Sequence, residues 1–155
     1  MATNKLRRAL TLTATMVLAA CARAPGPAFS ALDLPPTAYG RLYVYRPSIW
    51  FTAGMVAPVK VGTVREGELH DGSYLNIRLA PGRYIVDVNG VVARVAIVGG
   101  ANHFLEFDLS RSAAGIAALS GNQLATSLTE RGELHPRSEH EALPALRLLR
   151  DASAP

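Results

Sequence analysis

The chain of 155 residues contains one cysteine, at position 21. A single cysteine cannot form an internal disulfide, and the G-x-S-x-G, H-E-x-x-H and phosphate-loop motifs are also missing. The apolar stretch 9–20 has about a dozen residues, whereas a transmembrane helix needs about 20. These absences exclude a disulfide framework and leave no signature of the corresponding hydrolases, zinc proteases or nucleotide-binding proteins.

The residues before the cysteine have the order of an export signal. Three basic residues lie within the first eight positions, the apolar residues 9–20 follow, and Ala20 directly precedes Cys21. The run 18–21 (LAAC) resembles the lipobox of bacterial lipoproteins. The resemblance implies cleavage between Ala20 and Cys21 and acylation of the thiol, with palmitate among the usual acyl groups. We therefore expect residues 1–20 to be a lipoprotein signal peptide and Cys21 to be the lipidation site; the alternative is an ordinary signal peptide that leaves a free thiol.

The same segment predicts where the protein is located. Basic residues ahead of an apolar stretch stay in the cytoplasm, so the rest of the chain is exported. Position 22 is alanine rather than aspartate, which resembles lipoproteins released towards the outer membrane. We expect a lipid-anchored protein of the bacterial cell envelope, on the outer membrane and facing the periplasm. Its first partner is then the lipid bilayer, held through acylated Cys21.

Charge gives no sign of a nucleic-acid partner. The chain has 16 Lys and Arg against 12 Asp and Glu, but three of the basic residues belong to the expected signal. The remainder carries 13 basic and 12 acidic residues, or +1. No nucleic acid is therefore expected, and the 135 residues from Cys21 onward suffice for one domain.

Proline and glycine mark the first segment of the exported part. They predict an extended tether over residues 21–38, whose reach is at most roughly 55 Å. The alternative is that Phe29, Leu32 and Leu34 pack on the domain as an edge segment. A single domain is expected over residues 39–150, and residues 151–155 are expected to fray.

Alternation of side chains with a period of two predicts strands. In residues 41–46, Leu42 and Val44 lie on one face and Tyr43 and Tyr45 on the other. Further strands are expected at 59–64 with a kink at Gly62, then, after a turn at 65–72, at 73–79, 83–88, 91–98 and 103–109. This spacing predicts an all-β fold, a small β-sandwich of the immunoglobulin-like kind.

Turn residues and the C-terminal part complete the expected fold. Pro81-Gly82 predicts a type II turn, and Asn89-Gly90 predicts a type I′ hairpin turn. Residues 112–128 fit either an interrupted helix or a strand pair. A short C-terminal helix is expected at 139–143, stopped by the following proline, with a last strand at 145–149.

Three short runs resemble a known family. The runs 43–47 (YVYRP), 72–74 (GSY) and 79–84 (LAPGRY) are similar to those of bacterial envelope lipoproteins known chiefly as a domain of unknown function. The resemblance covers about residues 39–109 and implies a small β-sandwich like the carboxypeptidase regulatory modules. It implies no catalytic residues.

The aromatic residues around the first strand form the candidate binding surface. Tyr43 and Tyr45, on the outer face of their strand, are expected to join Arg46, Trp50 and Phe51 in one exposed patch. Amphipathic aromatic side chains favour interfaces and stack on sugar rings. The alternative is that these aromatic residues cap an open end of the sandwich, with Arg46 paired to a carboxylate such as that of Asp87.

Histidines give little support for a metal site. The runs 67–70 and 132–135 are both GELH, but His135 and His140 are five positions apart with a proline between them. They therefore do not share a helix face as an i, i+4 pair would. We expect polar turns in both runs, no metal or cofactor, and an ordinary strand-end role for His103.

Three functions remain as hypotheses. The first is a non-enzymatic binding or structural module for another envelope protein. The second is a glycan-binding module that uses Trp50 and Tyr45 against peptidoglycan or surface polysaccharide. An enzyme, a hydrolase or metal-dependent protein, is third, and it requires the polar residues of 66–71 to converge in a cleft.

Lipidation is tested directly by substitution of the cysteine. Cys21→Ser is expected to abolish incorporation of a labelled fatty acid, because serine offers no thiol for the diacylglyceryl group. Intact mass of the protein purified from envelopes measures the loss. Equal labelling of the wild type and the variant would contradict the assignment.

Overall fold

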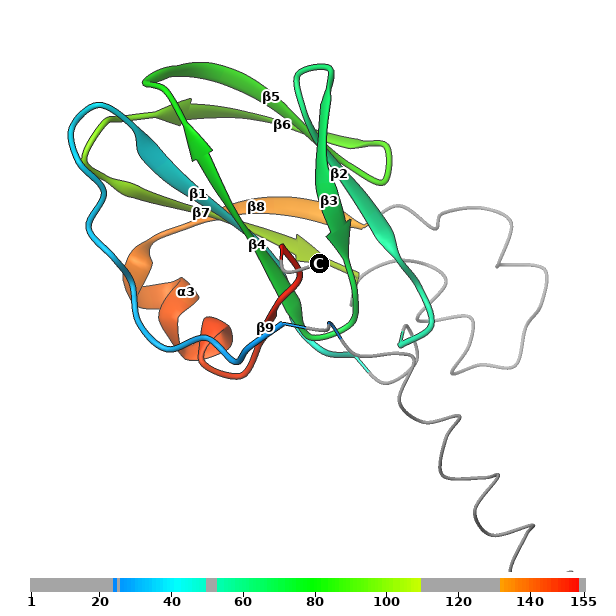
Figure 1. Ribbon diagram of the computed structural model, residues 1–155. Helices are drawn as coiled ribbons and strands as arrows, with labels where there is room; N and C mark the ends of the chain where they lie inside the picture. Colours follow the sequence, from blue (N-terminus) through cyan, green and yellow to red (C-terminus); the bar gives the residue numbers. More distant parts are fainter. Residues whose placement is uncertain (1–23, 25, 50–52, 110–131, 154–155) are drawn as a thin grey trace, which may run out of the picture.

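A computed structural model describes residues 24, 26–49, 53–109 and 132–153. The described chain forms two β-sheets packed face to face, with one short helix beside them (Figure 1). The predicted all-β sandwich with a short C-terminal helical segment is thereby confirmed. The expected signal peptide, Cys21, Trp50, Phe51 and the segment 112–128 lie outside the described residues.

The nine described strands divide into a five-stranded and a four-stranded sheet. The first has the spatial order β8 (Glu133–Arg137), β7 (Asn102–Asp108), β1 (Gly40–Arg46), β4 (Ser73–Leu79) and β9 (Arg150–Asp151). The second has the order β3 (Val64–Leu69), β2 (Ala57–Val61), β5 (Gly82–Val88) and β6 (Val91–Ile97). β1 is the centre of the larger sheet, because it pairs antiparallel with β4 and parallel with β7.

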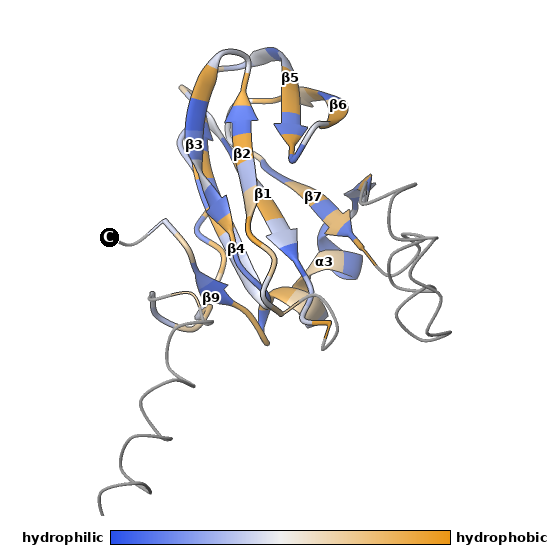
Figure 2. Ribbon diagram, turned by 90° about the vertical axis from the view of Figure 1, so that its right-hand side faces the viewer, coloured by the Kyte–Doolittle hydropathy of each residue, from blue (hydrophilic) through white to orange (hydrophobic). Residues whose placement is uncertain are grey.

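The main core lies between the two sheets. The longer strands contribute alternate side chains, as a period of two requires, and hydrophobic and hydrophilic residues alternate along the ribbons (Figure 2). Leu42 and Val44 of β1 are fully buried there, as predicted. They meet Val59 of β2 and Val86 of β5 from the opposite sheet, together with buried residues of the other strands.

The turns correct three predictions. Asn89 and Gly90 both have positive φ, 53° and 83°, as the predicted type I′ turn requires. Gly62, at φ 61°, is not a kink within one strand but part of the turn between β2 and β3. The prediction of a turn over residues 65–72 is therefore wrong, because residues 65–69 belong to β3. Gly82 has no positive φ and begins β5, so the type II turn is also wrong.

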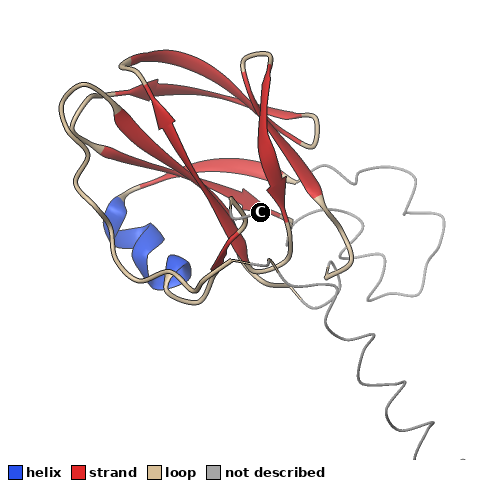
Figure 3. Ribbon diagram, viewed as in Figure 1, coloured by secondary structure: helices blue, strands red, loops and turns tan. Residues whose placement is uncertain are grey.

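A second core covers the outer face of the five-stranded sheet. The helix α3 (Glu139–Leu146) packs there, beside the strands drawn in red (Figure 3). Its start is fixed by a capping box between Ser138 and Glu141. It continues past Pro144, contrary to prediction, because Leu146 is buried against the sheet. The expected strand at 145–149 is replaced by the helix end, a turn and the two-residue β9.

The N-terminal segment completes the second core. Ala28 forms a bridge with Arg150, and the Phe29 ring meets the Tyr74 ring edge-on at 5.7 Å between centroids. Leu32 packs against the same cluster, whereas Leu34 is exposed. The extended tether is therefore wrong for residues 26–32, and the alternative of an edge segment is correct for Phe29 and Leu32. Buried apolar contacts outweigh the freedom of a tether.

Within the described ranges, no helix is both long enough and apolar enough to cross a membrane.

Substitution of two leucines that are two positions apart tests the second core. Leu146 is buried and Leu148 is 85% exposed. Leu146→Ala should lower the free energy of unfolding by about 2–5 kcal/mol because it removes buried methyl groups and leaves a cavity. Leu148→Ala should change it by less than about 0.5 kcal/mol. Urea denaturation followed by circular dichroism measures both, and equal effects would contradict a covered outer face.

Candidate functional site

The two tyrosines of the predicted aromatic surface are buried, and Trp50 and Phe51 lie outside the described residues. Tyr43 and Tyr45 do point to the outer face of β1, but α3 and the N-terminal segment cover them, and Tyr45 is 0% exposed. The Tyr43 ring stacks on the Phe104 ring at 5.5 Å. Burial raises the pKa of both tyrosines above the ordinary value. A binding role for Tyr43 and Tyr45, including glycan stacking on Tyr45, is therefore wrong.

Tyr45 is instead part of a polar network at the edge of the second core. Its hydroxyl donates to Glu106 Oε2 at 3.3 Å, and Arg137 Nε donates to the same oxygen at 2.6 Å. Burial, and then the Glu106 charge, raise the pKa of Tyr45. The hydrogen bond to Glu106 also raises the pKa of Arg137. The network joins β1, β7 and β8, so its role is structural.

Arg46 is also buried, at 0% exposure, at the end of β1. Its Nη1 donates to the Met55 carbonyl at 2.6 Å, and its Nη2 lies 3.8 Å from Asp71 Oδ1. Burial lowers the pKa of Arg46, and the Asp71 charge opposes that shift. Arg46 therefore cannot face a ligand, and the carboxylate beside it is that of Asp71 rather than Asp87.

The two carboxylates have separate structural roles. Asp71 accepts hydrogen bonds from Ser48 Oγ at 2.5 Å and from the Ile49 amide at 2.8 Å, so it holds the chain that follows β1. Asp87 accepts from the Gly90 amide at 2.7 Å within its own hairpin. Each carboxylate is therefore engaged by neighbouring groups of the fold.

The repeated GELH runs do not converge. His135 lies in β8 and pairs with Glu133 at 3.1 Å, so the expectation of a turn is wrong there. Glu68 lies in β3 and pairs with Arg65, away from Asp71. Among the described residues, no three His, Cys, Asp or Glu side chains are grouped as metal ligands. His103 Nε2 accepts a hydrogen bond from the Val98 amide at 2.9 Å, which is a strand-end role.

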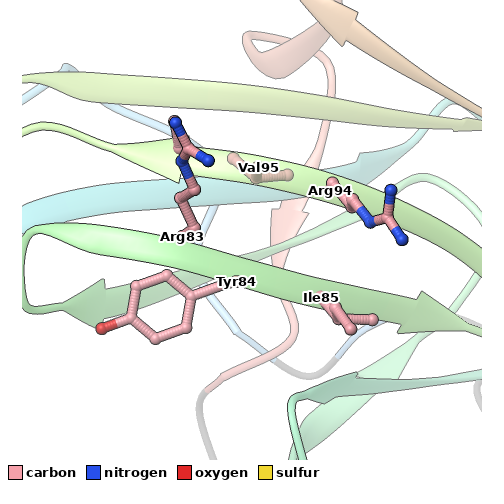
Figure 4. Close-up of a pocket in the computed structure, with 6 residues that line it drawn as sticks. Arg83, Tyr84, Ile85, Arg94 and Val95 are labelled. Atoms are coloured by element: carbon pink, nitrogen blue, oxygen red, sulfur yellow. The ribbon is translucent and has the colours of Figure 1, made fainter.

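The structure points to a different surface, at the edge strand β6. A cavity of about 520 Å³ lies along β5 and β6, where Arg83, Tyr84 and Ile85 of β5 are paired with residues 94–96 of β6 (Figure 4). A second cavity, of about 290 Å³, lies on the other side of β6. It is lined by residues 94–96 of β6 together with residues of β7, β8 and the start of α3. β6 is therefore paired with β5 on one side, and its unpaired side adjoins the second cavity.

β6 also differs from the other edge strands. β3 carries charged residues and a bulge near Gly67, β8 contains Pro136, and β9 has only two residues. Each of these features discourages pairing with another chain. β6 is seven residues long and carries one charged side chain, Arg94. Sequence alternation located this strand, but only the sheet order shows that it is an edge.

The Arg46 pair gives a stability test with a matched control. Asp71→Asn removes the charge beside a buried guanidinium and should cost about 3 kcal/mol of unfolding free energy. Asp33→Asn breaks the 3.6 Å pair with Arg41, where the Asp33 side chain is 76% exposed, and should cost less than about 1 kcal/mol. Thermal and urea denaturation measure both variants. A cost for Asp71→Asn no larger than for Asp33→Asn would contradict the structural role.

Comparison with protein-family models, with curated proteins and with solved structures finds no match to this chain. The resemblance to envelope lipoproteins therefore stays a prediction based on the sequence runs.

Proposed function

We propose that this protein is a lipid-anchored, non-enzymatic lipoprotein of the bacterial envelope whose β-sandwich binds another envelope protein through β6. The observation that carries the proposal is the unpaired edge of β6, with one cavity along β5 and β6 and a second between β6 and residues of β7 and β8. The lipobox-like run ending at Cys21 supports the anchor.

The edge of β6 suits an extended segment of a partner. An unpaired strand edge presents backbone donors and acceptors in a row, and an added strand completes them. The two outer faces of the sandwich also differ. The five-stranded sheet is covered by α3 and the N-terminal segment, whereas Ile85 and Val92 on the four-stranded sheet are more than half exposed.

Side chains near β6 indicate the chemistry of the partner. On the outward side of β5 and β6, Arg83 lies across from Ala96, Arg94 across from Ile85, and Val92 across from Asp87. The Asp87 carboxylate already accepts a hydrogen bond from the Gly90 amide. Arginine pairs well with carboxylates, so an apolar strand with acidic flanks fits this surface best.

In vivo photo-crosslinking tests the proposal. A photoreactive amino acid at Val92 or Ala96 should give a discrete adduct in envelopes, and the crosslinked peptide of the partner should be an extended acidic-apolar segment. The same probe at Val64 is the control, because Val64 is also on an edge strand and is 57% exposed against 59% for Val92. Adducts of equal yield from both edges, or none from β6, would count against the proposal.

Substitution gives the quantitative form of the test. Val92→Asp replaces an exposed apolar side chain on β6 with a second carboxylate opposite Asp87, and it should weaken binding about tenfold or more. Val64→Asp should leave the affinity within about twofold. Adduct yield at Ala96 in each variant measures the change. Adduct formation should also fall in Cys21→Ser if the partner resides at the membrane.

A further inference from the structure

The described chain is fixed to the sandwich from its start. Ala24 is buried, and the Gly26 amide donates to the Asp151 carbonyl at 3.1 Å. Arg150 Nη1 donates to the Gly26 carbonyl at 3.3 Å. A side chain on Gly26 would collide with the Asp151 backbone, so the N-terminal segment lies in direct contact with β9. The position of Ala24 is therefore set by the folded domain.

This contact leaves little chain between the domain and the expected lipid. Cys21 lies three residues before Ala24. Consecutive Cα atoms are 3.8 Å apart, so the two residues are separated by at most about 11 Å. The inference that follows rests on the lipid anchor at Cys21 given under the proposed function. A lipidated Cys21 then holds the end of the sandwich that carries Ala24 directly against the bilayer.

The surface at this end has a distinct composition. Ala24 lines a cavity of about 610 Å³ together with the turn between α3 and β9. That turn holds Arg147 and Leu148, and Arg150 follows in β9; all three are exposed, and Leu148 is 85% exposed. In Figure 1 the turn lies at the lower end of the domain, opposite β5 and β6.

The charges at this end are mainly positive. Asp71 also lines the cavity, but Arg46 and Ser48 already engage its carboxylate. Over the described part of the chain, neither Arg147 nor Arg150 has an ion-pair partner. Arginine beside an exposed leucine suits the boundary between anionic headgroups and acyl chains.

We propose that Ala24, Arg147, Leu148 and Arg150 form a membrane-facing surface that docks on anionic phospholipid headgroups. Leu148 enters the boundary between headgroups and acyl chains, while Arg147 and Arg150 contact phosphates. The short link and this surface together fix the orientation of the domain. β6 then points away from the bilayer, towards the partner.

A fluorescent label at two matched leucines tests the orientation. Leu34 is 84% exposed and lies beside Asp33, whose carbonyl accepts from Asn102 near the start of β1 and β7. Leu148→Cys and Leu34→Cys each introduce the only free thiol, because Cys21 is acylated. The lipidated variants are labelled with bimane and reconstituted in phosphatidylcholine vesicles, with or without phosphatidylglycerol and with a nitroxide lipid as quencher.

Quenching at position 148 should exceed that at position 34 by at least about threefold, and phosphatidylglycerol should increase it. Arg147→Ser should reduce the quenching at position 148, whereas Arg83→Ser on β5, at the opposite end, should not. Equal quenching at positions 148 and 34 in a protein with an acylated Cys21 would overturn this inference alone. An intact mass without acylation would overturn the lipid anchor, and the inference with it.

Discussion

β1 must be buried on both faces, and the rest of the structure follows from that constraint. Its inward residues, Leu42 and Val44, need the four-stranded sheet, and its outward residues, Tyr43 and Tyr45, need a second cover. A sheet face that carries two tyrosines and Phe104 cannot stay in water without a large loss of apolar burial. The helix α3 and the N-terminal segment supply that cover. The sandwich therefore has two cores, and the larger sheet is the layer that they share.

This arrangement explains which parts of the fold could be predicted from the sequence. The period of two in residues 41–46 predicted the strand and its inward face, because alternation is a local property. The cover over Tyr43 was not predictable in this way, because Phe29 and Leu146 approach it from opposite ends of the chain. β3 was missed because its charged residues and bulge remove the alternation. β8 was missed because its proline resembles a turn signal.

The predicted binding surface at β1 was wrong because contacts between distant parts of the chain decide which faces are covered. Alternation placed Tyr43 and Tyr45 correctly on the outer face of β1, but it cannot distinguish a solvated face from a covered one. The opposite holds for β6, whose residues look like an ordinary half-buried strand in the sequence. Only the order of strands in the sheet shows that β6 has one neighbour while β1 has two. The outward tyrosines of β1 serve the interior, whereas Ile85 and Val92 of the four-stranded sheet are exposed.

The contact between the two ends of the described chain affects how the protein is made. Arg150 and Gly26 are bonded although they are 124 positions apart. Synthesis delivers Phe29 long before Leu149 and β9. The second core cannot close on a partial chain that lacks these residues, because both sides of the contact must be present before so long a loop can close. Until β9 has been made, the outward tyrosines of β1 therefore wait for part of their cover.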